Sequence, residues 1–368
     1  MAKPTVQPTH TAATHANEDL SVAPMLQLPA LLAEFGVEWR HMLHRNGIDP
    51  ALLADQTNRI TIEAAGRLLV DCAAETGCPH FGLLVGQRAG ASAPGVPAAL
   101  LDDAGTVGEA LEALSRYLHV HDRAAVLALV PMERGRVRLS YLVFHPGTPG
   151  AALIMDAVLA VMVESMRSLC GPAWRPTEAW LPRSRPQRVG PYRACLRATL
   201  RFDSPHAAIV FPTADLERRP RRVQPEVRRR VMHIIETMEN ARPDTTSERV
   251  VRELSRSLLV GAPSGARIAA TLGISRRRLH ERLAAEGTRY SELLADIRCE
   301  IARQLLEGTR MPAGEIATAL HYSSPGAFSR AFRAWTGMTP REVRLAGSRA
   351  AGRPPAAGAR RSSQEVPA

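Results

Sequence analysis

Two short stretches of the chain decide its fold class, because one repeats the other 48 residues further on. Residues 268–275 read Ile-Ala-Ala-Thr-Leu-Gly-Ile-Ser, and residues 316–323 read Ile-Ala-Thr-Ala-Leu-His-Tyr-Ser. Each stretch has a small alanine near its start, a residue that tolerates a left-handed backbone at its sixth position, and a serine at its end. This order is typical of a helix, a tight turn and a second, capped helix. The chain is therefore predicted to hold two helix-turn-helix units, over residues 264–285 and 312–335.

The residue types in these stretches suit two helices that cross closely. A small side chain in the first helix lets the second helix pack against it, and the turn needs a residue that accepts positive φ, as Gly273 does. A serine then caps the second helix by accepting hydrogen bonds from its free backbone N–H groups. In the second unit Ser323 or Ser324 can fill that role, because Pro325 follows and suits the first helical position. The residues assigned to this structural role are Ala269, Gly273, Ser275, Ala317 and Ser323.

Helical geometry selects the outward face of each second helix. Leu279 and Leu283 share one stripe of the first, and Phe328 and Phe332 share one stripe of the second, so these pairs must face the core. The opposite faces are polar and carry arginines, which neutralise phosphates and read guanine. The pattern predicts double-stranded DNA as the partner. The residues predicted to contact it are Arg276, Arg277, His280 and Glu281 in the first unit, and Ser324, Ser329, Arg330 and Arg333 in the second.

A third helix is predicted between the two units. Leucine or isoleucine stands at positions 293, 297, 301 and 305, a spacing of four residues. This predicts a helix from about Tyr290 to Leu306, about 17 residues and roughly 25 Å long. Such a helix could hold the two recognition helices about 34 Å apart, which is one turn of B-DNA. One protomer is therefore expected to meet two successive major grooves.

The charge of the chain agrees with a polyanionic partner. The formal net charge is +11, and residues 241–345 hold 17 arginines against 11 acidic residues. Six of the eleven net charges thus lie in the segment that carries the two repeated stretches. The location of the charge is more informative than its total, because it places the basic surface where the DNA is expected.

The first half of the chain has a different pattern. Residues 28–117 show apolar side chains at spacings of three and four, which predicts helices, and residues 149–169 form a long amphipathic helix. In residues 136–144 apolar and polar side chains alternate, which suits a sheet with one covered face. The fold class is therefore an α+β N-terminal domain followed by an all-α C-terminal domain with two helix-turn-helix units. Strands are predicted over 124–130 and 136–144, and near 179–181, 198–202 and 208–211.

Composition predicts the domain boundaries. The stretch 217–230 is dense in proline and arginine, and the last residues are rich in Gly, Pro, Ala, Arg and Ser. The expected segments are a disordered leader over 1–24, an effector-sensing and dimerisation domain over 25–215, a linker over 216–241, a DNA-binding domain over 242–345 and a disordered tail over 346–368.

Four glycines in the first half could suggest a loop that cradles a phosphate. They stand at positions 82, 86, 90 and 95. No predicted strand precedes them and no Gly-Lys-Ser/Thr follows, as a phosphate-binding loop would require. They are therefore predicted to form turns between helices.

The C-terminal third resembles a known family of regulators. Residues 264–344 resemble the AraC/XylS DNA-binding domain nearly from end to end. The similarity is carried by Ser-Arg-Arg-Arg-Leu at 275–279, Glu-Gly-Thr at 286–288, residues 298–306, and Ala-Phe-Ser-Arg-Ala-Phe-Arg-Ala-Trp-Thr-Gly at 327–337 with Thr339 and Pro340. The resemblance implies a seven-helix domain and control of nearby promoters.

Three residues depart from the family pattern. His321 stands where the family usually has glycine, Gly326 replaces a common serine, and Glu281 occupies a position that is frequently basic. Histidine adopts a left-handed turn only at some cost, and Gly326 offers no side chain to DNA. The second helix-turn-helix unit is therefore expected to contribute less than the first.

The first half resembles the arabinose-binding-type N-terminal domain of one branch of this family. The matching residues lie at 47–55, 81–86, 202–203 and 210–212. In relatives this domain is thought to sense a small molecule or to mediate dimerisation. The resemblance implies a transcription factor that activates a nearby promoter in response to a small molecule, with RNA polymerase as a further partner and a homodimer as its assembly. The sequence assigns no effector-binding residues.

An enzymatic function fits the sequence less well. A DNA-repair methyl acceptor would need clustered zinc-bound cysteines with an activated thiolate. The five cysteines are scattered, none forms a C-x-x-C pair, and the histidine pairs at 41 and 44 and at 119 and 121 lack further ligands nearby in sequence. We therefore expect no enzyme, no cofactor and no metal site.

An architectural or repressor-type DNA-binding protein without an effector is the other alternative. Two distinct recognition faces on one chain favour specific sites instead. The first twenty residues contain no continuous apolar stretch, and the longest apolar run, over 151–166, is interrupted by Asp156 and Glu164. The protein is therefore expected to be cytoplasmic, without a membrane partner.

Overall fold

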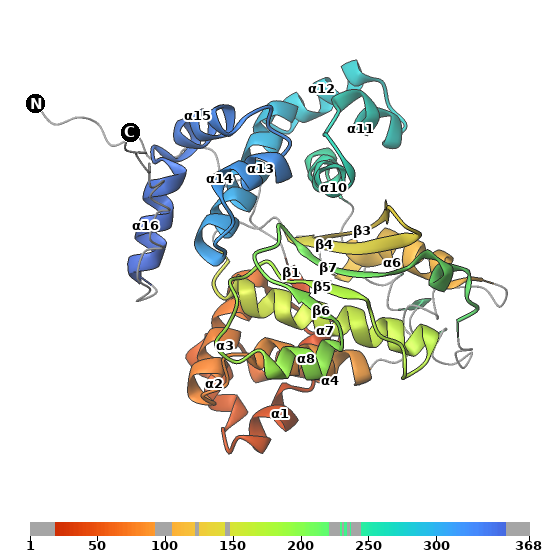
Figure 1. Ribbon diagram of the computed structural model, residues 1–368, viewed down its shortest axis with the longest axis vertical. Helices are drawn as coiled ribbons and strands as arrows, with labels where there is room; N and C mark the ends of the chain where they lie inside the picture. The colour runs from red at the N-terminus through yellow and green to blue at the C-terminus, as the bar shows by residue number, and fades with distance from the viewer. Residues whose placement is uncertain are drawn as a thin grey trace, which may run out of the picture.

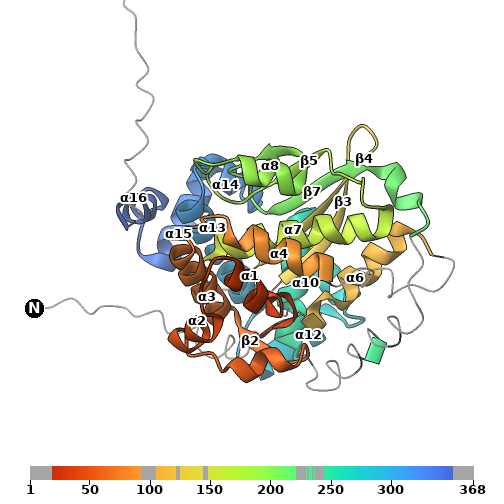
Figure 2. The ribbon, with the colours of Figure 1, turned by 90° about the horizontal axis from the view of Figure 1, so that it is seen from below.

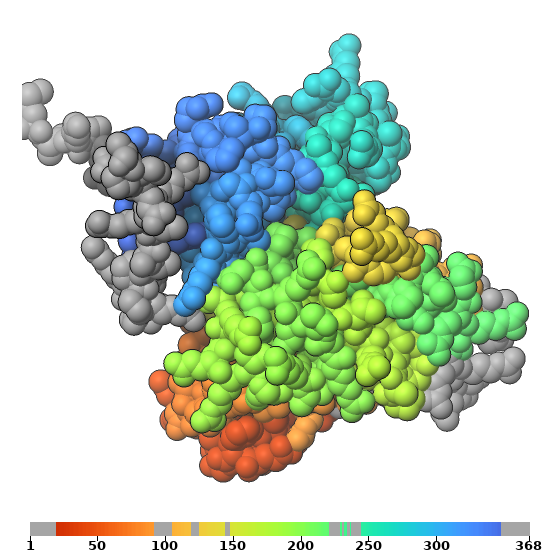
Figure 3. Space-filling view, viewed as in Figure 1, coloured from red at the N-terminus to blue at the C-terminus, as the bar shows by residue number. Residues whose placement is uncertain are grey.

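The structure is a computed structural model that describes residues 19–92, 105–121, 125–143, 148–220 and 244–350, together with residues 229, 232, 233 and 236. An N-terminal α+β domain lies below an all-helical C-terminal domain in Figure 1. The two domains meet across a broad surface, as the space-filling view in Figure 3 shows. The predicted fold class is confirmed.

The N-terminal domain is built on a five-stranded sheet with strand order β3-β4-β7-β5-β6. Strands β5 and β6 are parallel, and the other neighbours are antiparallel. Its strands are β3 (Ala125–Met132), β4 (Arg136–Val143), β5 (Glu178–Trp180), β6 (Thr199–Arg201) and β7 (Ala207–Pro212). The strands predicted from sequence thus all form, with ends shifted by at most two residues. Its helices are η1 (Ala23–Met25), α1 (Leu28–Glu34), α2 (Trp39–Arg45), η2 (Pro50–Ala54), α3 (Ile62–Glu75), α4 (Phe81–Ser92), α6 (Val107–His121), α7 (Ala151–Cys170), α8 (Gly190–Leu196) and η3 (Thr213–Glu217).

The C-terminal domain consists, within residues 244–350, of seven helices, as the family resemblance implies. They are α10 (Thr246–Val260), α11 (Gly265–Thr271), α12 (Arg276–Ala285), α13 (Tyr290–Gly308), α14 (Ala313–Ala319), α15 (Pro325–Thr336) and α16 (Pro340–Ala350). Helix α10 begins with a capping box, in which the Thr245 hydroxyl accepts from Glu248 N–H and the Glu248 carboxylate accepts from Thr245 N–H.

Both faces of the sheet are covered, which corrects the expectation of one covered face. Val137, Leu139 and Tyr141 of β4 point into the N-terminal core, where α7 and α6 pack. The alternate residues point the other way because side chains alternate along a strand. Among them, Leu142 and the β3 residue Val126 are buried in the core of the C-terminal domain. Helix α10 supplies the cover for this second face (Figure 1). Figure 2, seen from below, shows α4 and α7 side by side on the opposite side of the sheet.

Helices α4 and α7 approach each other unusually closely. A Cβ atom on Gly82 would lie 2.0 Å from the carbonyl oxygen of Leu153, and one on Gly86 would lie 2.0 Å from that of Ala157. Only glycine fits there, because no side chain can occupy that space. The prediction that these glycines form turns is wrong: Gly82, Gly86 and Gly90 lie inside helix α4. Gly95 lies outside the described residues.

Both ends of the folded part extend further than composition predicted. The leader was expected to reach residue 24, but β1 (Asp19–Ser21) pairs with β2 (Arg59–Thr61) and Val22 is buried. The tail was expected from residue 346, but α16 continues to Ala350. Local composition missed the first segment because its order comes from pairing with a strand about forty residues away in the chain. The remaining residues of the predicted leader, linker and tail lie largely outside the described residues.

Within the described residues, no helix is both long enough and apolar enough to cross a bilayer. Helix α7 is the longest helix of the N-terminal domain, and it carries a buried aspartate, Asp156. Its apolar side chains cover the sheet.

Replacing Gly86 by alanine tests the close packing of α4 on α7. In an ordinary helix interior this change would stabilise the protein, because alanine is the better helix former. Here the added methyl group collides with the Ala157 carbonyl, and we expect a loss of about 1–3 kcal/mol in the free energy of unfolding. Urea unfolding measures it, with the exposed Gln87→Ala on the same helix as control. A Gly86→Ala variant as stable as the control would contradict the packing.

Candidate DNA-binding site

The first helix-turn-helix unit is formed by α11 and α12. Gly273 in the turn has a φ of +68°, as its role requires. The Ser275 hydroxyl accepts a hydrogen bond from the backbone N–H of Arg278 at 3.2 Å and caps α12. Leu279 and Leu283 are fully buried, and Ala269 packs beneath them in the same core. The predicted start and core face of this helix are therefore confirmed.

The second unit is formed by α14 and α15. His321 adopts a φ of +55° at the position equivalent to Gly273. The cap of α15 is Ser324, whose hydroxyl accepts from the backbone N–H of Ala327 at 3.1 Å. The assignment of Ser323 as cap is corrected, since Pro325 occupies the first helical position and leaves the capping position to Ser324. Phe328 and Phe332 are fully buried, as predicted, and Ala317 is buried with them.

The outward face of α12 carries Arg276, Arg277, His280 and Glu281, and all four are exposed. Arg277 donates from Nε to the Glu281 carboxylate at 2.8 Å, while its side chain remains 89% exposed. This ion pair orients the guanidinium and leaves both terminal nitrogens free for a base or a phosphate. A surface pair of this kind contributes little to stability, so its effect is on the direction of the side chain.

The outward face of α15 carries Arg330 and Arg333, both exposed. A Cβ atom on Gly326 would lie 3.6 Å from Nη1 of Arg330, an ordinary van der Waals contact, so Gly326 lies directly beside this guanidinium. The Ser329 hydroxyl donates to the carbonyl oxygen of Pro325 at 2.9 Å and is half-buried. Its hydrogen is therefore already used, and the hydroxyl oxygen can act only as an acceptor for a further partner.

Helix α13 connects the two units, as predicted. It spans 19 residues, and Leu293, Ile297, Ile301 and Leu305 are buried along one side. Figure 1 places α12 and α15 on the part of the C-terminal domain that faces away from the N-terminal sheet. The two arginine-bearing faces are therefore not covered by the N-terminal domain.

A carboxylate that sequence reasoning did not single out fixes the first unit on α10. Glu286, which ends α12, accepts from the backbone N–H groups of Thr246 at 2.8 Å and Ser247 at 2.7 Å. Partial burial of Glu286 disfavours its charge, but these hydrogen bonds outweigh burial and hold its pKa below the ordinary value. A negative charge at a helix N-terminus is favourable. The family-like stretch at 286–288 was the only signal in the sequence that pointed to this residue.

The cysteines lack the features of a reactive thiol. Burial raises the pKa of Cys72 to about 12, and that of Cys170, Cys195 and Cys299 to about 11. A nucleophilic or zinc-bound cysteine needs a lowered pKa. Among the described residues no cluster of His, Cys, Asp and Glu could hold a metal ion, and the pair at 119 and 121 has no described side chains.

Known proteins share both domains of this chain. Residues 36–220 match the model of the arabinose-binding domain of AraC transcription regulators, N-terminal part, and residues 268–346 match that of a helix-turn-helix domain. The chain is 31% identical over 318 residues to the HTH-type transcriptional regulator VirS of Mycobacterium tuberculosis, covering 86% of this chain and 94% of VirS. The chain belongs to the AraC family of transcription regulators. It is accordingly a DNA-binding transcription factor.

Two further proteins are similar to this AraC-family regulator along most of their length. It is 25% identical over 323 residues to the ornithine utilization regulator of Pseudomonas aeruginosa, covering 86% of this chain and 93% of that protein. The crystal structure of the transcriptional regulator CdpR from Pseudomonas aeruginosa covers 84% of this chain and 98% of its own, with 24% identity and a TM-score of 0.37. A TM-score this low supports no conclusion about the DNA-binding site.

Replacing Arg277 by alanine tests the recognition face of α12. If Arg277 reads a guanine, we expect a loss of about 1–3 kcal/mol in binding free energy and a relaxed preference at one base pair. If it meets a phosphate, affinity should fall evenly across sequences and the salt slope should shrink by about one. Binding titrations at several salt concentrations separate the two. Arg193→Gln, at an exposed position of α8 in the N-terminal domain, is the control. An unchanged affinity and slope would remove Arg277 from the interface.

Proposed function

We propose that this regulator binds an asymmetric promoter site through both helix-turn-helix units of one protomer and activates the adjacent promoter in response to a small molecule. The observation that carries the first part is that one chain presents two exposed recognition faces with different residues. The first holds an Arg277–Glu281 pair, and the second holds Arg330 beside Gly326. Two unlike faces fit two unlike half-sites, whereas a palindrome needs two equal faces.

The exposed residues of α12 and α15 are assigned donor or acceptor roles toward DNA according to their side chains. In the first unit Arg276, Arg277 and His280 are donors toward guanine or phosphate, and Glu281 can accept from a cytosine amino group. In the second unit Arg330 and Arg333 are the donors, and Ser324 and Ser329 are at the end of α15 that enters the groove first. Helix α13 would set the two faces about 10 base pairs apart.

Activation adds two partners to this proposal. An activator bound beside a promoter is expected to contact RNA polymerase, and a homodimer would place two such chains on neighbouring sites. The regulator would act by binding alone, without chemistry on a substrate. An architectural protein or a repressor, in either case without an effector, is the alternative. The architectural protein would show a low ratio of specific to non-specific affinity, whereas the repressor would bind a specific site and lower transcription from the adjacent promoter.

Protection mapping on a promoter site tests the two-groove proposal. The intact chain should protect two successive major grooves on one side of the duplex, about 10 base pairs apart. Replacing both Arg330 and Arg333 by serine should abolish protection in one groove and leave the other, because each face contacts its own groove. Protection in one groove only, unchanged in this double variant, would make the second unit a structural support and refute the proposal.

A buried polar cluster in the N-terminal core is our candidate for the effector site. Asp156 of α7 is 1% exposed and pairs with Arg183, and its Oδ2 accepts from the Tyr192 hydroxyl at 2.6 Å. Burial, only partly offset by Arg183 and Tyr192, raises the pKa of Asp156 to about 6. Among the buried side-chain atoms that have no hydrogen-bond partner in the described residues, Oδ1 of Asp156 and Nε of Arg183 belong to this cluster. Nδ1 of His80 is a third such atom, and the charge of Arg183 acts on the His80 ring. Buried polar atoms without partners are costly, so a small molecule with both a donor and an acceptor would be stabilised there.

The backbone next to Arg183 reaches the DNA-binding domain. Ser184 N–H donates to the carbonyl oxygen of Gly308 at 2.8 Å, where α13 ends. Asp203, whose N–H donates to the Arg183 carbonyl, accepts from the N–H of Arg310 at 2.7 Å. A ligand that moves Arg183 would thus move the segment that leads into the second helix-turn-helix unit. This connection supports control of DNA binding from the buried cluster.

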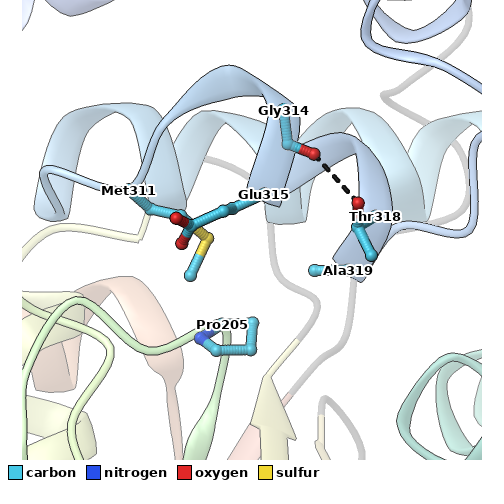
Figure 4. A pocket seen from close by; sticks show the side chains of 6 residues that line it. All are labelled: Pro205, Met311, Gly314, Glu315, Thr318 and Ala319. Carbon is cyan, nitrogen blue, oxygen red and sulfur yellow. Dashed lines mark hydrogen bonds between the residues drawn. The ribbon is translucent and has the colours of Figure 1, made fainter.

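A groove adjoins these contacts on the interdomain surface. It measures about 380 Å³ and lies between the N-terminal domain and α14, as Figure 4 shows. Its lining is largely apolar, and the Thr318 hydroxyl turns back to the Gly314 carbonyl instead of facing a ligand. We therefore place the effector at the buried cluster and not in this groove. The lining residues are Pro205, Met311, Gly314, Glu315, Thr318 and Ala319.

A thermal-shift screen of small amines, amides and amino acids tests the effector proposal. A compound that binds only the folded protein raises its melting temperature by mass action, by about 2–4 °C for each kcal/mol in a domain of this size. Asp156→Asn should abolish the shift, whereas Glu112→Gln, at an exposed position of α6, should keep it. A shift that survives in Asp156→Asn would place the effector elsewhere, and a screen without any shift would favour the effector-free alternative.

A further inference from the structure

Two consecutive backbone carbonyl groups at the end of α10 accept hydrogen bonds from side chains of different domains. The carbonyl oxygen of Leu258 accepts from Nε2 of His321 at 3.2 Å. The next carbonyl oxygen, that of Leu259, accepts from Nη2 of Arg138 at 3.2 Å. His321 belongs to the turn of the second helix-turn-helix unit, and Arg138 belongs to strand β4 of the N-terminal sheet. We call these four residues the interdomain joint.

Carbonyl groups at a helix C-terminus need partners, because no further turn of the helix donates to them. Positive donors are also favoured there by the helix dipole. The joint therefore satisfies the end of α10 with one donor from each domain. A glycine at position 321, which is usual in the family, could not supply the first of these bonds.

The turn around His321 is held from a second side as well. Nη2 of Arg298 in α13 donates to the His321 carbonyl oxygen at 3.4 Å, and the same guanidinium lies 4.7 Å from the centre of the Tyr322 ring. The ring of Tyr322 packs against Phe328 of α15 at 5.7 Å. The conformation of the turn is thus connected to the recognition helix through aromatic packing.

Arg138 is itself fixed in the sheet. Its Nε donates to the Ser140 hydroxyl at 2.9 Å, and its guanidinium lies 5.0 Å from the centre of the Trp180 ring. Leu258 is buried together with Val126 and Leu142 of the sheet in one apolar cluster. The end of α10 therefore cannot shift relative to the sheet without breaking these contacts.

We propose that His321 is a positioning residue for DNA recognition, whose ring fixes the turn of the second helix-turn-helix unit on α10 and, through Arg138, on the N-terminal sheet. The proposal rests on the proposed two-groove function. It reverses the expectation from sequence that His321 weakens the second unit. The hydrogen bond that the ring donates offsets the cost of the left-handed backbone, and the N-terminal domain then helps to orient α15.

Three substitutions at position 321 separate positioning from backbone strain. Glycine and asparagine relieve the backbone strain, since both tolerate positive φ. Neither can replace the hydrogen bond to Leu258. Glycine has no side chain, and the asparagine amide nitrogen extends only as far from the backbone as Nδ1 of histidine. Glutamine keeps the backbone strain, but its amide nitrogen extends as far from the backbone as Nε2 of histidine and can donate to the same carbonyl group. If His321 only strains the turn, His321→Gly and His321→Asn bind better than His321→Gln. If His321 positions the turn, the order is reversed.

The experiment uses the intact chain and two DNA duplexes, one with both half-contacts and one with the second half-contact scrambled. We expect His321→Gly and His321→Asn to lose about 3- to 10-fold affinity on the first duplex, the size of one hydrogen bond, and nothing on the second duplex. His321→Gln should recover most of the loss. Glycine or asparagine variants that bind as tightly as the wild type would overturn the proposal.

Arg138→Gln tests the connection to the N-terminal domain. It removes a contact on the far side of α10 from the DNA, and we expect the same loss on the same duplex. Combined with His321→Gly the two effects should not add, because both act through one helix end. Arg193→Gln, which removes an arginine from an exposed position of α8, should leave the affinity for both duplexes unchanged. Full additivity, or an unchanged Arg138→Gln, would confine the effect to the turn and overturn the link to the sheet.

The same data test the two-groove function separately. If the wild type binds both duplexes equally, the second unit makes no contact, and both the proposed function and the role of His321 fail together. If the wild type prefers the intact duplex while the three variants at position 321 retain that preference, the two-groove function stands and only the positioning role fails.

Discussion

Helix α10 is buried on two sides at once, and the relation between the domains depends on this shared burial. One side lies on the β3–β4 face of the N-terminal sheet, and the other belongs to the core that α12 and α13 complete. Apolar area removed from water on both sides makes separation of the domains costly. Val126 and Leu142 of the sheet are thereby part of the core of the DNA-binding domain. The sheet and the helix-turn-helix units therefore form one connected body, and not two units on a free linker.

This arrangement gives the N-terminal domain a physical route to both recognition helices. Glu286 ties α12 to the start of α10, and His321 ties the turn before α15 to its end. The segment between α13 and α14 makes further backbone contacts with the N-terminal domain. Because α12 and α15 point away from the sheet, the contacts orient the recognition helices without covering them. Control by a bound effector would therefore change the angle and spacing of the two faces.

The close contact between α4 and α7 likewise fixes two elements against each other inside the N-terminal domain. Glycines on α4 let its backbone lie directly against α7, and α7 in turn covers the sheet. Asp156 lies on α7 within this packed layer and connects to Arg183 near the domain boundary. A densely packed interior transmits small displacements, because it has little free volume to absorb them.

Local chemistry determined much of this protein in advance. The turn glycine at 273, the cap at Ser275 and the apolar stripes of the recognition helices were all readable, because each depends on neighbours within a few residues. The exposed arginines followed from helical periodicity alone. The tertiary structure decided the rest, since it depends on contacts between distant segments. From sequence alone the glycines of α4 were predicted to form turns, because nothing local shows that α7 packs against them. His321 was likewise predicted to weaken its unit, because the hydrogen bond from its ring to the Leu258 carbonyl joins residues 63 positions apart.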